Sequence, residues 1–162
     1  MRRWLVGGAL IRHDDGLVLV CNRRRDNSVE WTPPGGVIDH GETLLVGLAR
    51  EVFEETGLVV NSWTDRCYTV TVEAPDMGWV MTVEAWETEQ VSGEICIADP
   101  DGIVEEVRHS SAAHAVELLT ASSAGAAASR SERAAGVPWS GWSRAAGADG
   151  SAMRADADFA VR

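Results

Sequence analysis

The sequence of 162 residues contains no lysine, and its 14 basic residues, all arginines, are outnumbered by 25 acidic residues. The formal net charge of −11 argues against non-specific nucleic-acid binding, because proteins of that class present a basic surface to the phosphates. An acidic protein can still bind an anionic phosphate ester when metal cations lie between the two. The charge therefore excludes one class of partner and leaves small phosphorylated ligands open.

Cysteine is also scarce. Cys21, Cys67 and Cys96 are widely spaced and odd in number, so they predict neither a disulfide framework nor a CxxC metal or redox site. We expect reduced, mostly buried thiols.

Long apolar runs are absent, since no stretch approaches the roughly 20 residues that span a bilayer. Arg2 and Arg3 precede an apolar run over 4–11, as in a short signal peptide. That run contains two glycines and lacks a small-residue cleavage site, so a β-strand is the better interpretation. We expect no membrane association and a cytoplasmic location.

The pattern along the chain predicts alternating strands and helices, and hence a mixed sheet with helices on its faces. A hairpin signal, Asp14-Asp15-Gly16, separates the first two strands, and Gly57 is expected to end the first helix. The expected strands are 4–13, 17–22, 58–60, 68–73, 79–86 and 94–98; the helices are 43–56 and 111–119; and 26–41 is expected to lack regular structure.

The composition changes after Thr120, where Ala, Ser and Gly predominate. So little apolar surface predicts a tail that is flexible or weakly docked. We therefore expect two parts, a catalytic domain over 1–120 and a tail over 121–162.

Three acidic residues of the helix expected over 43–56 share one face. Glu51, Glu54 and Glu55 follow spacings of three and four, which places their carboxylates within an arc of about 100°. Arg50 can offset only part of their repulsion. Carboxylate oxygens are the ligands that Mg²⁺ prefers, and the ion shares its other positions with substrate phosphates. The alternative is an ordinary solvated acidic face.

The surrounding residues favour the metal. The run Gly36-x5-Glu42-x7-Arg50-Glu51-Val52-x-Glu54-Glu55-x-Gly57-Leu58 matches the Nudix box at every specified position, and the chain resembles the Nudix hydrolase superfamily (MutT-like) over about residues 4–119. The resemblance implies an α/β/α sandwich with a mixed β-sheet and a loop–helix–loop metal site.

The resemblance also implies roles for the residues of the box. Glu51, Glu54 and Glu55 would be the principal ligands of Mg²⁺ or Mn²⁺, and Gly36 would let the backbone approach the metal. Glu42 would support the site, and Arg50 would orient a catalytic glutamate. One to three ions would bridge the glutamates and a diphosphate, a water molecule would attack phosphorus in line, and a glutamate would take its proton.

The proton acceptor is left open by the sequence. Within the family it is often the position that matches Glu51, but some members use a distant carboxylate. The candidates for that second arrangement are Glu105, Glu106, Asp99 and Asp101.

Two features outside the box could contact substrate. Arg23, Arg24 and Arg25 follow a strand, where the family often places an arginine on phosphate, with Arg23 or Arg24 favoured; a solvated strand end is the alternative. For Trp31, packing of the glycine-rich loop is favoured over base stacking.

The implied reaction is the hydrolysis of a phosphoanhydride bond in a nucleoside diphosphate linked to another group. Nucleoside triphosphates, including oxidised ones, are the first expectation. Diadenosine polyphosphates, ADP-ribose and nucleotide sugars are alternatives, and a non-catalytic nucleotide sensor is the alternative from another class. The expected partners are a small-molecule nucleotide and, in a homodimer, a second copy of the chain.

Overall fold

The larger of two sheets is mixed. The computed structural model describes residues 2–13, 16–24, 27–128 and 154–156. The sheet has the order β5-β1-β7-β6-β9, in which β1 and β7 are parallel and the other neighbours antiparallel. Its strands are β1 Arg2–Leu10, β5 Gly35–Val37, β6 Val59–Ala74, β7 Trp79–Ser92 and β9 Arg154–Asp156.

The smaller sheet is built around β3, which pairs antiparallel with β2, β4 and β8. Its strands are β2 Arg12–His13, β3 Gly16–Arg23, β4 Val29–Thr32 and β8 Val104–Ser111. The expected hairpin is confirmed, because Arg12 lies opposite Leu17 in the antiparallel register. The first expected strand divides between the two sheets, as β1 joins one and β2 the other.

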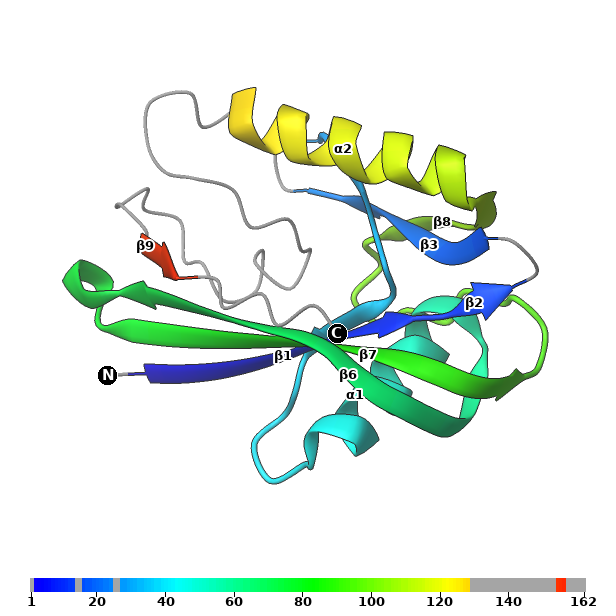
Figure 1. The fold of residues 1–162 in the computed structure, drawn as a ribbon, viewed down its shortest axis with the longest axis horizontal. Helices are drawn as coiled ribbons and strands as arrows, with labels where there is room; N and C mark the ends of the chain where they lie inside the picture. Colours follow the sequence, from blue (N-terminus) through cyan, green and yellow to red (C-terminus); the bar gives the residue numbers. More distant parts are fainter. Residues whose placement is uncertain (1, 14–15, 25–26, 129–153, 157–162) are drawn as a thin grey trace.

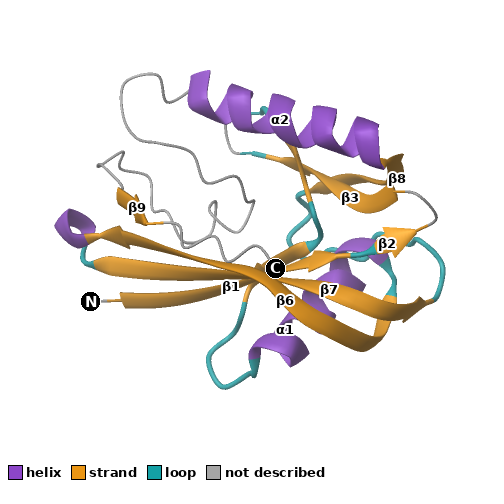
Figure 2. Ribbon diagram, in the orientation of Figure 1, coloured by secondary structure: helices purple, strands orange, loops and turns teal. Residues whose placement is uncertain are grey.

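Two helices complete the fold, α1 Leu44–Thr56 and α2 Ala112–Ala128, with a 3-10 turn η1 Pro75–Met77 between β6 and β7. Helix α2 lies across β3 and β8, and α1 lies on the other side of the molecule, by the strands of the larger sheet (Figures 1 and 2). The predicted α/β architecture, with a mixed sheet and helices on its faces, is confirmed.

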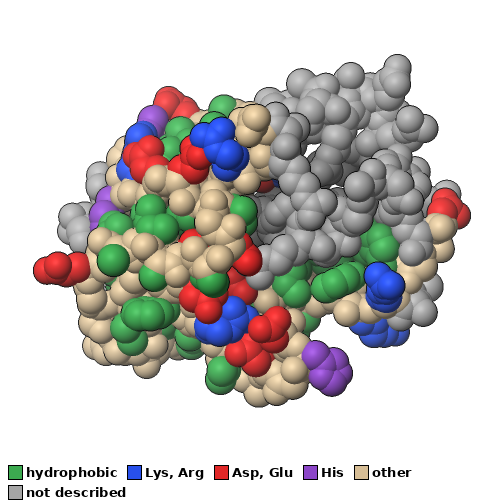
Figure 3. All heavy atoms as spheres, turned by 180° about the vertical axis from the view of Figure 1, so that it is seen from behind, with side chains coloured by type: hydrophobic (Ala, Val, Ile, Leu, Met, Phe, Trp, Pro, Cys, Tyr) green, Lys and Arg blue, Asp and Glu red, His purple; other side chains and the backbone are tan. Residues whose placement is uncertain are grey.

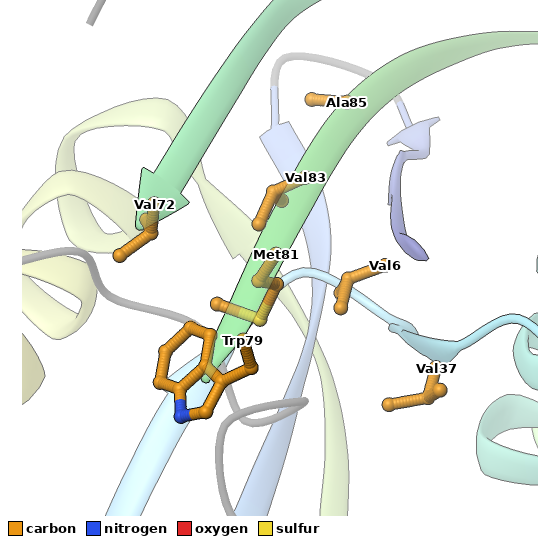
Figure 4. Close-up of a cluster of buried hydrophobic side chains, with 7 residues drawn as sticks. All are labelled: Val6, Val37, Val72, Trp79, Met81, Val83 and Ala85. Carbon is orange, nitrogen blue, oxygen red and sulfur yellow. The ribbon is translucent and has the colours of Figure 1, made fainter. Parts of the chain in front are cut away.

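The buried core has two parts. The first lies on the larger sheet around Trp79, Met81 and Val83, with Val6 and Val37 beside them (Figure 4). The second joins both sheets to α1, because Leu48 and Val52 of the helix share one cluster with Val18 of β3. Helix α1 is therefore fixed by apolar contacts on its buried side, and its acidic side is free to serve a site.

The tryptophans of the two sheets differ in burial. Trp79 is buried, and Trp4 and Trp86 pack partly buried against the two cores. Trp31 is half-buried: its backbone N–H donates to Ser122 of α2, and the Arg108 guanidinium lies 4.8 Å from its ring centroid.

Several local predictions were wrong. Residues 26–41 include two short strands, β4 and β5, and the strands expected at 58–60 and 68–73 are parts of the single strand β6. Residues 94–98 form no strand. The thiols are also less buried than expected, since only Cys21 is buried, whereas Cys67 and Cys96 are exposed.

Helix α2 crosses the expected boundary at residue 120 and continues to Ala128. Of the expected tail, 129–153 and 157–162 lie outside the described residues. No helix in the described part of the chain is both long and apolar enough to cross a membrane.

Candidate metal centre

Helix α1 carries the residues of the candidate site, and its ends explain its length. Thr43 precedes it at the N-cap position in an extended conformation, and its side chain makes no capping hydrogen bond. Gly57 ends the helix in the left-handed conformation (φ 76°), where its N–H donates to the Phe53 carbonyl oxygen. This is the stop that the sequence predicts.

Two of the three box glutamates are buried between α1 and β5. Glu51 is 1% exposed and Glu55 5% exposed, whereas the side chain of Glu54 is 26% exposed. Glu55 Oε2 accepts a hydrogen bond of 2.8 Å from the backbone N–H of Gly35. Burial of a carboxylate is costly unless charge or hydrogen bonds compensate it, so this pair indicates a specialised site.

The two glycines of β5 are required by close approaches. A Cβ atom on Gly36 would lie 2.4 Å from Glu51 Oε2, so only a glycine leaves room for the carboxylate. Gly35 has φ +151°, and a Cβ there would lie 2.2 Å from the carbonyl oxygen of Gly7 on β1. The glycine-rich segment therefore lies close to the acidic face of α1, whereas the approach of Gly36 to a metal stays a prediction.

Arg50 joins the acidic residues into one network. Its guanidinium contacts Glu42 through two nitrogen–oxygen pairs of 3.2 and 3.0 Å, and contacts Glu51 at 3.0 Å and Glu54 at 3.1 Å. The carboxylate of Asp39 lies 3.5 Å away. On the face of the molecule drawn in Figure 3, acidic side chains lie beside basic ones in more than one place.

The electrostatics follow from this network. The hydrogen bond from Arg50 holds the pKa of Glu42 below its ordinary value of 4.5. The same hydrogen bond, aided by the charge of Glu51, raises the pKa of Arg50. Arg50 is thus a fixed cation that offsets part of the repulsion among the helix carboxylates.

The atoms available at this site are of the type that hard divalent cations prefer. Glu51, Glu54 and Glu55 offer carboxylate oxygens, and the space opposite Gly36 would be filled by a Cβ. Among the described residues, no three His, Cys, Asp or Glu side chains are already grouped as metal ligands. Because Arg50 contacts both Glu51 and Glu54, metal binding requires those side chains to turn from the guanidinium toward a common point.

The arginines expected on phosphate have carboxylate partners. Arg23 pairs with Glu105, and Arg24 pairs with the buried Glu30; Arg25 lies outside the described residues. Sequence reasoning missed Glu30, although its alternation with Thr32 in a β-rich run was a signal that both face the same side.

The candidate distant bases differ in their surroundings. Asp99 accepts hydrogen bonds from the backbone N–H groups of Asp101, Ile103 and Val104, so it stabilises a turn. Glu106 pairs with Arg108 at 2.6 Å, and Glu105 with Arg23. Both glutamates are exposed at the start of β8.

A separate pocket with a volume of about 430 Å³ lies beside Leu58, which follows the C-terminal end of α1, where the two sheets meet. Its walls are mostly apolar, with Glu94 and His109 among them, and they include none of the glutamates of the box. The lining residues are Ile11, Val18, Leu58, Val91, Ser92, Gly93, Glu94, Ile95 and His109.

Known proteins similar to this chain agree with this description. A MutT-like protein from Streptomyces ambofaciens is 47% identical over 55 residues, which cover 34% of each chain. An NAD-capped RNA hydrolase, NudC, from Escherichia coli O1:K1 / APEC is 38% identical over 95 residues, or 59% of this chain and 34% of that one. The chain thus spans about a third of the length of these relatives.

Solved structures share the fold. The Escherichia coli ORF135 protein has a TM-score of 0.62 at 19% identity, with 74% of this chain and 81% of that chain covered. The MutT NUDIX hydrolase from Burkholderia pseudomallei has a TM-score of 0.58 at 22% identity, with 75% and 98% covered. Residues 1–131 match the NUDIX domain family. With this match, the intact box and the shared fold, the chain belongs to the Nudix family.

Proposed function

We propose that this chain is a metal-dependent Nudix pyrophosphohydrolase that cleaves a phosphoanhydride bond in a nucleoside diphosphate linked to another group. The observation that carries the proposal is the burial of Glu51 and Glu55 against Gly35 and Gly36. Such burial is unfavourable without a cation, and Arg50 contacts only one of the two buried carboxylates among its ion pairs. A divalent metal bound by these oxygens would offset the charge of both buried carboxylates.

The residues of the box would have different roles in the reaction. Glu51, Glu54 and Glu55 would hold Mg²⁺ or Mn²⁺, which when bound neutralises charge on the phosphoryl oxygens and makes water a better nucleophile. Glu42 keeps Arg50 in place through two contacts, and Arg50 positions Glu51. Glu51 is our first candidate for the proton acceptor, with Glu105 and Glu106 as alternatives on β8.

Nucleoside triphosphates, including oxidised ones, are the substrates we propose first, and the likeness to a MutT-like protein supports that choice. A nucleoside diphosphate joined to a second nucleoside or to a sugar is the second candidate, because the likeness to an NAD-capped RNA hydrolase extends over the longer stretch of 95 residues. Diadenosine polyphosphates, ADP-ribose and nucleotide sugars belong to this second class.

The test is hydrolysis of a panel of both classes with Mg²⁺ or Mn²⁺, with product analysis in ¹⁸O-labelled water to identify the attacked phosphorus. Glu54→Gln and Glu55→Gln should lower kcat/KM by about 100-fold or more, because each removes a charged group that stabilises the reacting phosphate. Mn²⁺ affinity, measured by electron paramagnetic resonance, should fall in the same variants.

Glu117→Gln on α2 is the matched control, since its exposed carboxylate lies outside the network of Arg50. Turnover and Mn²⁺ affinity equal to those of the wild type in both box variants would contradict the metal role. Nucleotide binding without turnover across the panel would favour the non-catalytic sensor.

A further inference from the structure

The pocket beside Leu58 has an apolar floor and an exposed rim. Three of its lining residues, Ile11, Val18 and Leu58, are at most 6% exposed and belong to the core cluster that joins both sheets to α1. The rim is more exposed and includes Glu94 and Ile95. The pocket volume of about 430 Å³ lies within the range of roughly 300–1,000 Å³ that is usual for sites of small molecules.

The rim is held in place by hydrogen bonds on both sides. Directly after Ile95, the N–H of Cys96 donates to the carbonyl oxygen of Thr56 at 2.9 Å, which ties the segment to the end of α1. At the other side, Asn61 Nδ2 of β6 donates to Ser92 Oγ at 3.0 Å. The walls are therefore fixed before any ligand arrives, as is usual for the sites of small molecules.

The pocket is separate from the metal centre. Glu51 lies against Gly36, and Glu55 accepts from the N–H of Gly35, so the metal centre is built on β5. The walls of the pocket instead come from β3, β7, β8 and the segments next to β2, α1 and β7. The metal and the phosphates of the proposed substrate therefore do not need this pocket, and its ligand is a separate question.

The charges around the pocket favour a cation. Glu94 brings a carboxylate to the rim, and no arginine is among the described residues that line the pocket. This carboxylate is also not one of those that Arg50 contacts. Leu58 follows the C-terminal end of α1, whose last turn holds no basic residue, so no side chain there offsets the partial negative charge of the helix end. Both features repel an anion and attract a cation.

We propose that this pocket binds a small molecule with an apolar body and one ammonium group. The apolar body would lie against Ile11, Val18 and Leu58, and the ammonium group beside Glu94. Burial of the body supplies most of the affinity, because an exposed ion pair contributes little by itself. The charge supplies selectivity, because it distinguishes an amine from an acid of the same shape. The site goes beyond the proposed function, since it involves neither the metal nor the substrate of that reaction.

The first test compares three indoles of similar shape and different charge: tryptamine, a cation; 3-ethylindole, which is neutral; and indole-3-propionate, an anion. Calorimetry at about pH 8, where an ordinary histidine such as His109 of the rim is neutral, would measure the three affinities. Excess Mg²⁺ keeps the ammonium group from the acidic residues of the box. Tryptamine should bind about threefold tighter than 3-ethylindole, and indole-3-propionate should bind more weakly than both.

Nuclear magnetic resonance locates the bound indole on the same protein. Tryptamine should shift the amide signals of Gly93, Glu94 and Ile95, which line the pocket. The signals of Gly35 and Gly36 at the metal centre should stay in place. Larger shifts at the two glycines of β5 than at the rim would place the amine at the metal centre and overturn the proposal.

The second test removes the charge of the rim. Glu94→Gln should reduce the preference for tryptamine over 3-ethylindole to about one, because the ammonium group then has no carboxylate beside it. Glu89→Gln is the matched control: it removes the same charge from β7, where Glu89 accepts from Ser62 and does not line the pocket. This control should keep the preference of the wild type. An equal loss of preference in both variants would show that the net charge of the protein attracts the amine, and not the pocket.

The third test changes the apolar walls. Val91 lines the pocket and packs partly buried against the core, so Val91→Phe should fill the space and weaken the binding of all three indoles about tenfold or more. Ile95→Ala removes part of the rim at a side chain that is 39% exposed. It should weaken binding about threefold and remains informative if Val91→Phe does not fold.

Three further results would overturn the proposal. They are equal affinities for the three indoles, no measurable binding at millimolar concentration, and affinities unchanged in both wall variants. Sedimentation velocity adds a fourth, because a dimer of the wild type that dissociates in Val91→Phe would assign the pocket to a second copy of the chain. None of these measurements requires hydrolysis, so failure of this proposal and failure of the proposed function are distinguishable.

Discussion

Gly36 illustrates how a single residue can limit the metal centre. A Cβ at this position would lie 2.4 Å from Glu51 Oε2 and 2.7 Å from Glu51 Cδ. Because Glu51 is 1% exposed, its carboxylate has little room to withdraw. We predict that Gly36→Ala lowers kcat/KM by about tenfold or more, since a displacement of about 1 Å at a reacting group is costly.

The control for this variant is Gly78→Ala. Gly78 has φ +71° but nothing within 4 Å of an added Cβ, so its substitution should lower the melting temperature through backbone strain and leave kcat/KM unchanged. If Gly36→Ala were as active as Gly78→Ala, Glu51 would not need its present position.

Arg50 makes a prediction about pH. Its hydrogen bond holds the pKa of Glu42 below 4.5 in the folded protein, so the pair stabilises the fold above about pH 4.5 and this contribution is lost as the pH falls through the lowered pKa. The difference in unfolding free energy between wild type and Arg50→Gln should therefore be largest near neutral pH and shrink on acidification.

Urea unfolding of both proteins in a chelator, from about pH 7 to about pH 3, measures this difference. Arg12→Gln, which removes an exposed ion pair with Glu87, reports the effect of losing an arginine elsewhere. Parallel pH curves for wild type and Arg50→Gln would show that the pairing with Glu42 does not contribute to stability.

Some of the side-chain contacts in this structure could be predicted from the sequence, and others could not. The acidic face of α1 was predictable, because helical spacing alone brings Glu51, Glu54 and Glu55 together. The partner of Arg24 was not, since the register that places Glu30 opposite Asn22 depends on the pairing of β3 with β4. The alternation of Glu30 with Thr32 indicates a shared face, but it does not give the register between the two strands.

At the scale of elements, the strand that was wrongly expected over 94–98 shows how hydrogen bonds to a neighbouring helix can override local composition. Residues 94–98 have the composition of a strand, but the N–H groups of Cys96 and Ala98 donate to the carbonyl oxygens of Thr56 and Glu54 at the end of α1. These carbonyls have no partner within the helix. Because the N–H groups of residues 94–98 supply hydrogen bonds to these carbonyls, the segment does not pair with a strand.

In the glycine-rich segment, by contrast, strands form where none were expected. Its two prolines suggested irregular structure, but they fall between β4 and β5. Gly35 and Gly36 then lie opposite Gly8 and Gly7 of β1, where the absence of side chains permits close pairing. In this segment the prolines separate two strands, and the glycines lie within one of them.

The end of α1 gives a testable consequence. An added Cβ on Gly57 would lie 2.7–2.8 Å from backbone atoms of Cys96 and Glu94, at a φ of +76°. We predict that Gly57→Ala lowers the unfolding free energy by about 2 kcal/mol, through backbone strain and displacement of the loop. Urea denaturation measures the loss, and Gly102→Ala, with φ +64° and nothing within 4 Å, isolates the strain alone. Equal losses of unfolding free energy in the two variants would mean that the loop at Glu94 and Cys96 can move away from the added Cβ without cost.

At the scale of the whole molecule, α1 is the point where the two sheets meet, because its apolar side shares one cluster with both. Its acidic side faces β5, which hydrogen-bonds to β1 of the larger sheet. The mixed sheet and the helix that carries the box were predictable from periodicity and the box; the metal that the box would bind stays a prediction. The division into two sheets was not, as it occurs within one expected strand, between β1 and β2.

The expected boundary at residue 120 can be examined by truncation. Removal of 121–162 would cut α2 and delete Ser122, which accepts the N–H of Trp31, whereas removal of 132–162 leaves α2 whole. Among the described residues, the shorter deletion removes only β9 and its three pairs with β6. We predict that deletion of 121–162 lowers the melting temperature by several degrees more than deletion of 132–162, because loss of about 1–2 kcal/mol shifts a domain of this size by about that amount.

Hydrolytic activity should persist in the shorter deletion, since none of the residues proposed for the metal centre or for the proton acceptor lies beyond Glu106. Circular dichroism melts and the substrate panel measure both properties on the same preparations. Equal stability of the two truncated proteins would support a boundary at 120, because α2 would then contribute nothing after that residue. A loss of activity already in the deletion of 132–162 would instead place part of the catalytic unit in the Ala/Ser/Gly-rich segment.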